Sequence, residues 1–557
     1  MILPSTKCQS AKVPKCEECL RDKYMRSDDK FYSNLPESAG EYIRLVVKKV
    51  GYKRKIRNEI RDELIAHFED AMANIADPAA KDVKAKELIS EFGDPKLLAT
   101  LSRRAKKRCR PMWVKILIRT SQVAGVIFAY LLVCSIPFFI GKPRPSVNYL
   151  DVISKEFENN RDPNCNDKAA YDSAAALATA YPIEIDKVPV WPGDVNETRR
   201  KLITEWLNSN KKAIEAFRKA NKHDVFWFAY NYESLNIDSA KPLYLQIDNL
   251  RKDSALMHYR YLAYAVSQNS VVLAHAGNTK QALEDCARLS EFGSRQGGQG
   301  LAVEQIVGIA INALADKASF EILARAELPH DILKKFQNSL LSIPYTSVHY
   351  GIEKILYFDL IQHYYSDDSS GNGHVLGKAL PYIYTDAKSS MLRFLTFDYP
   401  TKKEMLATVD SYYNELELNC EITPWERRQI KSNRPPQVPM MLVLTGESLI
   451  QVAQIAWRNR VYHDGLIATV ALLRYKAEKG SNPEILDELV NAGYLTQLPR
   501  DPFSDKPLVY KKTNEGFTIY SVGLNFKDDG GKLERDKKGK PQMWAGKGDA
   551  VFWPVSK

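Results

Sequence analysis

The feature that most constrains this chain is a run of eighteen residues, 123–140, that carries no charge. As a helix this run would extend about 27 Å, close to the ~30 Å hydrocarbon core of a bilayer. Eleven of its residues are Val, Ile, Leu or Phe, and together they favour insertion by about 3–7 kcal/mol. The run predicts one transmembrane helix over residues 113–140, against the alternative of a buried core helix in a soluble protein.

The two flanks of this run differ in charge. Residues 103–119 carry eight Lys or Arg and no acidic residue, whereas residues 141–160 carry three basic and three acidic residues. The positive-inside rule therefore predicts a cytoplasmic N-terminus and a long C-terminal part outside the membrane. The basic block also predicts contact with anionic lipid of that membrane. Because the first hydrophobic run starts past residue 110, we expect no N-terminal signal peptide, and the internal helix would be its own insertion signal.

The predicted membrane helix divides the eight cysteines. On the outer side Cys165, Cys286 and Cys420 allow one disulfide with one thiol left over, which is not a disulfide scaffold. Cys16 and Cys19 have zinc-knuckle spacing, but no second pair accompanies them, so a reduced, unstructured tail is expected instead. No basic motif is interleaved with base-stacking aromatic residues, so nucleic-acid binding is not expected despite the net charge of +11. The remaining cysteines are Cys8, Cys109 and Cys134.

We expect residues 1–36 to form a flexible tail and residues 37–110 to form a cytoplasmic helical domain. A four-residue apolar step in the middle of this domain predicts a long amphipathic helix, and two short helices separated at residues 92–95 follow it. The arrangement resembles a HAAS-type domain, the helical module that precedes a transmembrane helix in some bacterial signalling proteins. The resemblance implies a helper or protein-contact module and not an enzyme. The residues that carry it are Ile60, Leu64, His67, Phe68, Ala85, Leu88, Ile89, Phe92, Gly93, Asp94, Pro95, Leu97, Leu98 and Ala99, among which His67 is expected to pack between helices.

We expect residues 147–437 to form an extracytoplasmic helical domain. Within it, residues 198–220 are expected to form one helix, and residues 254–341 a series of helical hairpins. The join at residues 274–283 resembles the turn of a tetratricopeptide-type hairpin, but a 34-residue repeat does not recur. We therefore expect an irregular array whose surface binds protein or peptide.

A further helix is predicted over residues 345–365, and it places His349, Glu353 and His363 roughly on one face. A straight helix would keep His363 about 15 Å or more from Glu353. A polar helix face is therefore favoured over a metal site. Asp367 and Asp368, in the loop that follows, are expected to be solvated.

We expect residues 438–557 to form a long helix followed by a small α+β unit. The helix, over residues 438–479, is expected to be continuous or broken near Gly446 or Gly465. The following segment resembles the C-terminal region of the type II secretion major pseudopilin, and a strand is expected over residues 517–522 because polar and apolar side chains alternate there. The residues that carry the resemblance are Ala471, Leu472, Tyr475, Lys476, Gly493, Tyr494, Leu495, Leu498, Pro499, Asp501, Pro502, Phe503, Pro507, Tyr510, Tyr520, Ser521, Gly523, Asp549, Val551 and Trp553.

The pseudopilin resemblance implies a calcium site, since in that family an Asp-rich loop binds the ion through oxygen ligands. The matching residues are Asn525, Asp528, Asp529 and Asp549. Asn525 stands where a carboxylate is usual, and a basic insert at residues 532–542 lengthens the loop. The alternative is a hydrogen-bonded turn. The membrane helix lies more than 320 residues before this unit, so the unit is expected to be an interaction or capping module and not a polymerising pilin.

The fold class predicted is mainly α, with a cytoplasmic helical module, one transmembrane helix, a helical-hairpin ectodomain and a small C-terminal antiparallel sheet. No nucleophile elbow, phosphate loop, paired metal-ligand motif or dinucleotide fingerprint is present. We therefore expect a non-enzymatic, secretion-like or envelope scaffold that contacts inner-membrane lipid and envelope or secretion-related proteins. One alternative is a transmembrane signalling or regulatory subunit with the N-terminal domain as its output. Another is an envelope hydrolase that uses His349 and Glu353.

Overall fold

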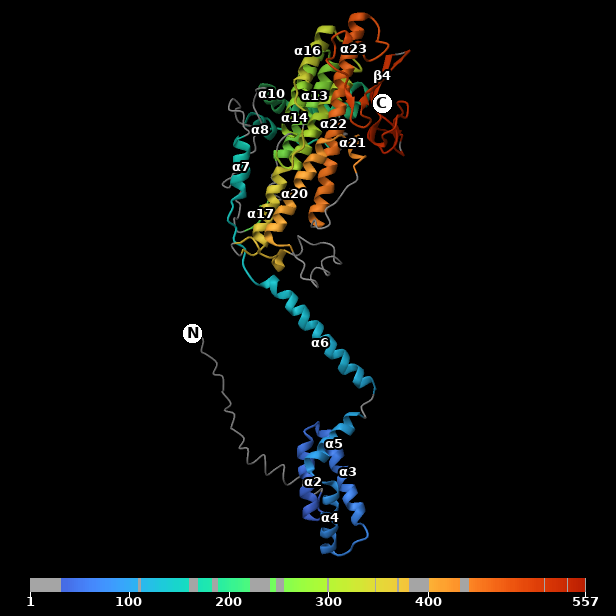
Figure 1. Ribbon diagram of the computed structural model, residues 1–557. Helices are drawn as coiled ribbons and strands as arrows, with labels where there is room; N and C mark the ends of the chain where they lie inside the picture. The colour runs from blue at the N-terminus through green and yellow to red at the C-terminus, as the bar shows by residue number, and fades with distance from the viewer. Residues whose placement is uncertain are drawn as a thin grey trace, which may run out of the picture. The chain divides into compact units, whose positions relative to one another are not determined.

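The computed structural model is mainly helical and ends in a small antiparallel sheet (Figure 1). One of its helices is long and apolar enough to cross a membrane. These features confirm the coarse fold class predicted from the sequence. The chain divides into two compact units, residues 1–131 and residues 132–557. The structure describes residues 32–108, 112–159, 169–182, 189–220, 241–246, 255–297, 300–345, 347–367, 370–379, 400–430, 440–514, 516–537 and 539–555.

The first unit packs its helices around a core that the four-residue apolar step predicted. On the longest of these helices, Ile60, Leu64 and Phe68 are buried. The His67 ring contacts Phe92 edge-on, with ring centroids 5.2 Å apart, as expected of a packing residue. Tyr32, which falls within the predicted tail, is buried in the same core. The helices are α2 (Glu37–Val50), α3 (Arg54–Met72), α4 (Pro78–Phe92) and α5 (Pro95–Arg108).

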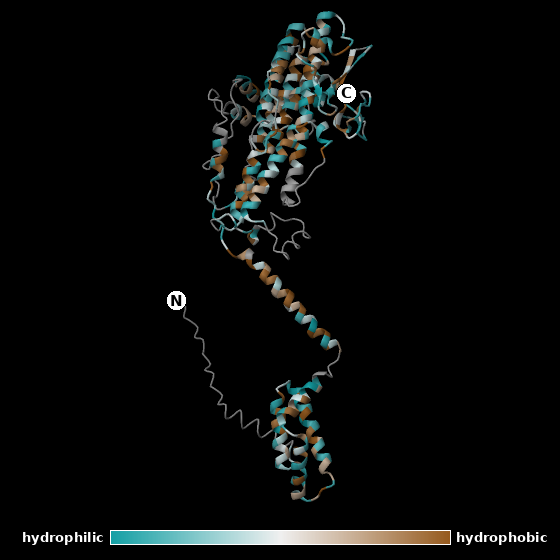
Figure 2. Cartoon of the chain, viewed as in Figure 1, coloured by the Kyte–Doolittle hydropathy of each residue, from teal (hydrophilic) through white to brown (hydrophobic). Residues whose placement is uncertain are grey.

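Helix α6 (Met112–Phe139) contains the predicted apolar run except its last residue, Ile140. Its 28 residues correspond to a length of about 42 Å. Within Met112–Ile136, an apolar window of 18 residues has none of its residues buried inside the protein, and Figure 2 shows hydrophobic residues along most of the helix. At its C-terminal end Phe138 joins a core cluster of the second unit.

The first half of the second unit consists of paired helices, as the sequence predicted for residues 254–341. Gly277, with φ of 87°, lies in the predicted hairpin turn and allows the chain to reverse there. The elements of this half are α7 (Tyr149–Asn159), α8 (Ala169–Ala176), the short 3-10 turn η2 (Pro192–Asp194), α9 (Glu197–Ser209), α10 (Lys211–Lys219), α13 (Ala255–His275), α14 (Thr279–Gly297), α15 (Ala302–Leu323) and α16 (His330–Leu341).

The single helix predicted over residues 198–220 is wrong, because Asn210 divides it into α9 and α10. Asn210 is fully buried. Its side-chain oxygen accepts the Thr179 backbone N–H at 2.9 Å, and its Nδ2 donates to the Trp206 carbonyl oxygen at 2.9 Å. An Asn side chain that competes for backbone groups in this way favours a helix end over a helix interior.

Helices α14 and α15 cross at glycines, so that their backbones come into contact. A Cβ atom on Gly308 would lie 2.1 Å from the Gly297 nitrogen and 2.6 Å from the Gly293 oxygen. Because only hydrogen fits in these places, the crossing requires glycine. This contact is the closest approach of helices that the described glycines show.

Helix α22 (Met440–Lys479) runs for 40 residues and is broken at neither Gly446 nor Gly465. Helix α17 starts at Gly351 and not at residue 345 as predicted. Tyr345, before it, donates its hydroxyl to Asp464 at 2.5 Å. The neighbouring elements are α17 (Gly351–Tyr364), η3 (Gly377–Ala379), α20 (Lys402–Glu421), α21 (Pro424–Arg427) and α23 (Glu488–Asn491).

The C-terminal sheet has the order β3-β4-β7 and is antiparallel throughout. The predicted strand is present as β4, whose Phe517 and Ile519 are buried. On α22, Gly465 lies against Phe552 of β7, where a Cβ atom would come within 2.3 Å of the Phe552 ring. The strands are β1 (Arg500–Asp501), β2 (Lys506–Pro507), β3 (Val509–Thr513), β4 (Gly516–Ser521), β5 (Glu534–Arg535), β6 (Pro541–Gln542) and β7 (Ala550–Trp553), and the turn η4 (Gly523–Asn525) follows β4.

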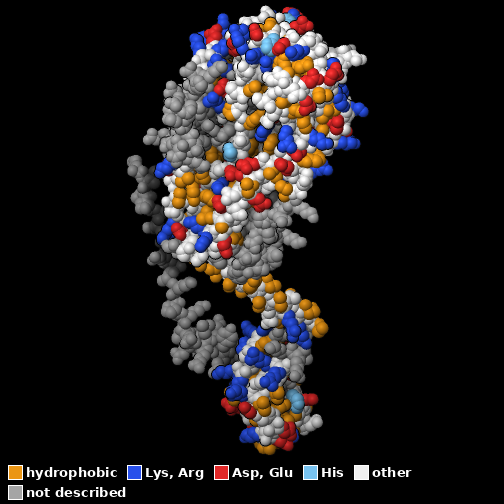
Figure 3. All heavy atoms as spheres, turned by 45° about the horizontal axis from the view of Figure 1, so that its top comes forward, with side chains coloured by type: hydrophobic (Ala, Val, Ile, Leu, Met, Phe, Trp, Pro, Cys, Tyr) orange, Lys and Arg blue, Asp and Glu red, His pale blue; other side chains and the backbone are white. Residues whose placement is uncertain are grey.

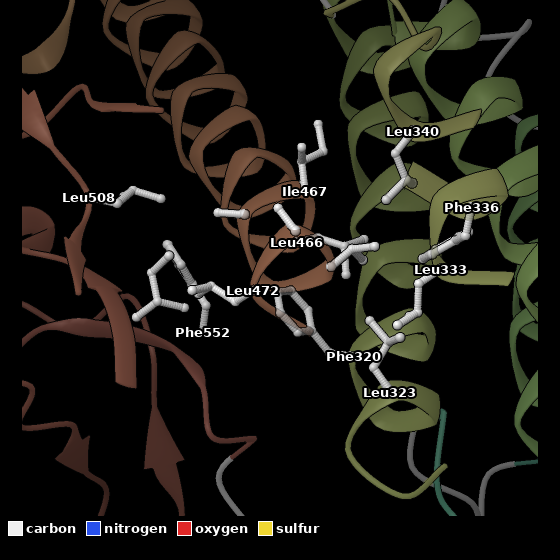
Figure 4. Close-up of a cluster of buried hydrophobic side chains, with 14 of the residues drawn as sticks. Phe320, Leu323, Leu333, Phe336, Leu340, Leu466, Ile467, Leu472, Leu508 and Phe552 are labelled. Carbon is white, nitrogen blue, oxygen red and sulfur yellow. The ribbon is translucent and has the colours of Figure 1, made fainter. Parts of the chain in front are cut away.

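One hydrophobic core joins the helical hairpins to this sheet. Figure 4 shows side chains of α22, such as Leu466 and Leu472, between those of α15 and α16 and those of the sheet region. The regions predicted as separate, 147–437 and 438–557, therefore belong to one compact unit.

Candidate binding groove

A groove of about 790 Å³ lies between α14 and α16 in the hairpin array. Its apolar lining comes from Leu283 and Ala287 of α14 and from Ile332 and Phe336 of α16. Leu283 and Phe336 are buried and part of the shared core, whereas Ile332 is partly exposed. The remaining lining residues are Lys280, Glu284, Arg288, Glu291, Arg295, Asp331, Lys335, Asn338, Ser339 and Ser342.

The wall formed by α14 carries charges of alternating sign, at spacings of three or four residues from Lys280 to Arg295. Arg295 is paired with Glu291 at 2.8 Å, and Arg288 donates to the Ala220 carbonyl oxygen at 2.7 Å. In contrast, the side chains of Lys280 and Glu284 have no ion pair or hydrogen bond among the described residues. The same holds for Lys335 on the opposite wall. The groove therefore presents an apolar floor with unpaired charges of both signs along its edges.

Both walls are held rigidly from behind. On α14, Asp285 is buried and receives two hydrogen bonds of 3.0 Å from Arg218 Nε and a closer one from Arg218 Nη2. On α16, Gln337 Nε2 donates to the Tyr494 carbonyl oxygen at 2.7 Å, and Gln337 Oε1 accepts from Arg474 at 2.6 Å. A groove held in this way is pre-organised, so a ligand binds without the cost of ordering its walls.

Gln337 also links the groove to the C-terminal region. Its partners are Arg474, near the end of α22, and Tyr494, just after α23. Arg474 lies over the Tyr494 ring, 5.1 Å from its centroid. This part of the chain therefore supports α16, which forms one wall of the groove.

A second, smaller pocket of about 300 Å³ is lined by His349, Cys420, Trp457 and Arg460, among others. The Arg460 guanidinium lies 4.2 Å from the centroid of the Tyr345 ring and 5.1 Å from that of Trp457. Burial raises the pKa of the Cys420 thiol. Since the thiolate and not the thiol is the nucleophile, Cys420 is poorly suited to covalent catalysis at neutral pH.

A buried polar network between α15 and α22 was not predicted. His463 Nδ1 is 3.0 Å from both carboxylate oxygens of Asp316, and both side chains are almost completely buried. Ser290 donates to the same carboxylate at 3.4 Å, and His463 Nε2 faces the Leu340 carbonyl oxygen at 3.4 Å. Asp316 therefore stands between serine and histidine, so His463 is not placed to take a proton from Ser290, as a hydrolase would require.

Burial alone would lower the pKa of His463, but the charge and hydrogen bond of Asp316 raise it to about 9. The imidazole is therefore protonated at neutral pH and forms a buried ion pair with Asp316. The residues are 147 positions apart on α15 and α22, so no spacing rule connects them. The only signal in the sequence is a polar pair, His463-Asp464, inside a helix that is otherwise rich in apolar residues.

The residues suspected of hydrolase or metal chemistry do not share one environment. Glu353 Oε1 accepts the Ala302 backbone N–H at 2.5 Å, and burial raises the pKa of Glu353 to about 7. His363 Nδ1 instead lies 2.9 Å from the Asp359 carbonyl oxygen, while His349 is exposed and lines the second pocket. Within the described ranges, no group of three or more His, Cys, Asp or Glu is arranged to hold a metal ion.

Of the predicted calcium site, Asn525, Asp528 and Asp529 lie between β4 and β5, and Asp549, directly before β7, is the centre of a hydrogen-bonded turn with that segment. Its Oδ1 accepts the Asp529 N–H at 3.1 Å, and its Oδ2 accepts those of Gly531 at 2.6 Å and Lys532 at 3.2 Å. Since these backbone groups occupy both oxygens, the arrangement matches the turn that the sequence left as the alternative. Calcium binding itself stays a prediction. The other contacts are Asp528 with Gly530 N and the Tyr520 hydroxyl, and Asn525 Nδ2 with Asp529.

Cys286 and Cys420 are free and buried, so they do not form the disulfide that the sequence allowed between them. Cys134 in α6 is also free. Cys165 and the N-terminal cysteines Cys8, Cys16, Cys19 and Cys109 lie outside the described residues, as does Asp368. The Asp367 carboxylate lies 3.9 Å from Lys402 Nζ.

No family model, curated protein or solved structure matches this chain. The HAAS-type and pseudopilin resemblances therefore stay predictions based on the residues that carry them.

Proposed function

We propose that the chain is a single-pass inner-membrane protein that acts as a non-enzymatic envelope or secretion-like scaffold. In this proposal α6 spans the membrane, and the second unit lies in the periplasm and binds a partner protein. The apolar length of α6 and its one-sided basic flank support the anchoring. The single observation that carries the binding role is the groove between α14 and α16.

The groove fits an amphipathic helix of a partner protein. Its floor offers a narrow apolar strip, and its α14 wall alternates in charge about once per helical turn. A helix with an apolar stripe and charges repeating at the same interval would place opposite charges against Lys280, Glu284 and Lys335. Because these three charges have no partner among the described residues, the pairing does not require an existing ion pair to break.

Photocrosslinking in native membranes tests this proposal. A photoreactive amino acid at Asn338, an exposed lining residue, should capture a partner protein, and the same group at exposed Asn208 on α9 should not. The Lys280→Glu/Lys335→Glu variant should reduce the adduct at least fivefold. Its matched control is Lys201→Glu/Lys476→Glu, which changes the net charge equally on exposed lysines outside the groove.

An adduct of equal yield from both positions, or one that survives reversal of the groove charges, would count against the groove as the binding site. Extraction of the protein from membranes by alkaline carbonate would contradict the membrane span. These two readouts are independent, so each part of the proposal can fail separately.

The compact helical first unit favours signalling as a second candidate function. In that case the first unit would bind a cytoplasmic partner, and groove occupancy would change that binding. Capture of a partner by the first unit that weakens at least threefold in the Lys280→Glu/Lys335→Glu variant would favour signalling. Unchanged capture would favour the scaffold.

A further inference from the structure

The first unit concentrates unpaired basic residues at one end. Residues 48–57, which form the turn from α2 into α3, include six Lys or Arg and no acidic residue. Lys48, Lys49, Lys53, Arg54 and Lys55 are exposed, and none forms an ion pair or side-chain hydrogen bond with another residue that the structure describes.

The fold brings a second basic segment to the same end. Arg103 of α5 lies over the ring of Tyr52, 5.6 Å from its centroid, although the two residues are 51 positions apart in the sequence. Residues 103–108 add five Lys or Arg without an acidic residue. Two carboxylates of α3, those of Glu59 and Glu63, are paired with Lys106 of α5. We call this surface, formed by residues 48–57 and 103–106, the basic pole.

The rest of the unit has a different charge. At the opposite end, where α3 gives way to α4 and Ser38 of α2 bonds to Asp82, the exposed residues include Glu69, Asp70 and Asp77. In Figure 3, Lys and Arg gather at the end of this unit that leads into α6, and Asp and Glu gather at the other end. The two ends of the unit therefore differ in their exposed charge.

The basic pole lies close to the start of α6 along the chain. Only three residues separate Arg108 at the end of α5 from Met112 at the start of α6, and four peptide steps reach at most about 14 Å. Trp113 stands where an interface anchor is expected. Electrostatic attraction extends over a screening length of about 8–10 Å at physiological salt. The tether therefore keeps the pole within about one to two screening lengths of the membrane interface.

We propose that the basic pole binds anionic phospholipid headgroups and holds the first unit against the leaflet on its own side of the membrane. This inference rests on the proposed membrane span. Clusters of four to eight basic residues beside a membrane helix are the usual signature of anionic-lipid binding. Here α2, α3 and α5 build such a cluster into a folded surface instead of a flexible tail.

The test uses the full-length protein in nanodiscs of phosphatidylcholine, alone or with about one-third phosphatidylglycerol. A photoreactive amino acid replaces exposed Asn58 beside the pole, or exposed Ala80 at the opposite end, and lipid adducts are measured by mass spectrometry. Phosphatidylglycerol should raise the adduct at Asn58 at least fivefold and leave that at Ala80 unchanged.

Charge-reversal variants test whether lipid binding depends on the basic pole itself or only on the net charge of the protein. Lys53→Glu/Arg54→Glu/Lys55→Glu should remove the increase, and Lys81→Glu/Lys84→Glu/Lys86→Glu on α4, an equal change in charge, should retain it. Equal adducts in both lipids, or an increase that survives the first variant, would overturn the proposal. Loss of the adduct on adding RNA at the same phosphate concentration would assign the pole to nucleic acid and would also overturn it. A protein that does not incorporate into nanodiscs would refute the membrane span, whereas incorporation without an adduct refutes only lipid binding by the pole.

Discussion

Substitution of Gly308 by alanine tests the packing that sets the position of the α14 wall. The added Cβ would lie 2.1 Å from the Gly297 nitrogen and 2.5 Å from its Cα, well inside a van der Waals contact of about 3.5–4.0 Å. Because these are backbone atoms, no side-chain rotation relieves the contact, and the two helices must separate by more than 1 Å. Overpacking of this kind costs about 3 kcal/mol, the upper part of its usual range.

Helix propensity acts in the opposite direction, because alanine is about 1 kcal/mol better than glycine inside a helix. The net expectation is a loss of about 2 kcal/mol in the free energy of unfolding. The second unit has 426 residues, from 132 to 557. At about 2.1 cal/mol/K per residue, its unfolding entropy converts this loss to a fall of about 2 °C in the midpoint.

Differential scanning calorimetry of the full-length protein in detergent micelles measures this shift. The matched control is Ala310→Gly on the exposed face of the same helix, which changes propensity alone and should cost about 1 kcal/mol. If propensity governed both sites, Gly308→Ala would raise the midpoint by about 1 °C. A midpoint that rises or does not change would therefore refute the backbone contact between α14 and α15.

Three further predictions concern buried charges and the C-terminal loop. The pKa of His463 is raised to about 9, so this residue stabilises the fold fully below the ordinary value near 6.5, and the contribution is lost as pH rises through about 9. Thermal midpoints should fall between pH 7 and 10, and Asp316→Asn should remove most of this dependence. Burial raises the pKa of Glu353 to about 7, so ionisation costs stability as pH rises from about 4.5 to 7. Glu353→Gln should make the thermal midpoint depend less on pH over that range. An unchanged dependence on pH would show that the carboxylate is not enclosed. Asp549→Ala removes the acceptor of three backbone N–H groups and should cost about 2–4 kcal/mol, measured by urea unfolding. EDTA should not change the wild-type midpoint if the loop is a hydrogen-bonded turn, whereas a fall that added calcium reverses would support the calcium site.

Features that depend on neighbours in the sequence were predictable. The four-residue step of Ile60, Leu64 and Phe68 predicted the buried face of α3, because side chains four apart lie on the same side of any helix. The uncharged run predicted α6, since length and composition alone decide whether a helix can cross a membrane. Alternation around Phe517 and Ile519 predicted β4 in the same way.

Local signals failed where a distant partner decides the structure. Asn210 ends α9 because Thr179, 31 residues earlier, bonds to its side chain. Gly465 does not break α22, because its missing Cβ makes room for the ring of Phe552. A glycine in a helical pattern can mark a helix break or a close contact with another element. Which of the two it marks depends on the element that packs against it, and the neighbouring residues in the sequence do not identify that element.

By itself, then, the sequence determined where most helices lie, which one is apolar enough for a membrane, and that the chain ends in a small sheet, but not every helix boundary. The tertiary structure decided which surfaces those segments share. The groove exists because α14 and α16 pack side by side, and the Asp316–His463 pair exists because α15 packs on α22. The basic pole exists because α5 returns to the turn after α2. Helix formation depends on residues within one or two turns, whereas each of these sites depends on contacts between segments tens to more than a hundred residues apart.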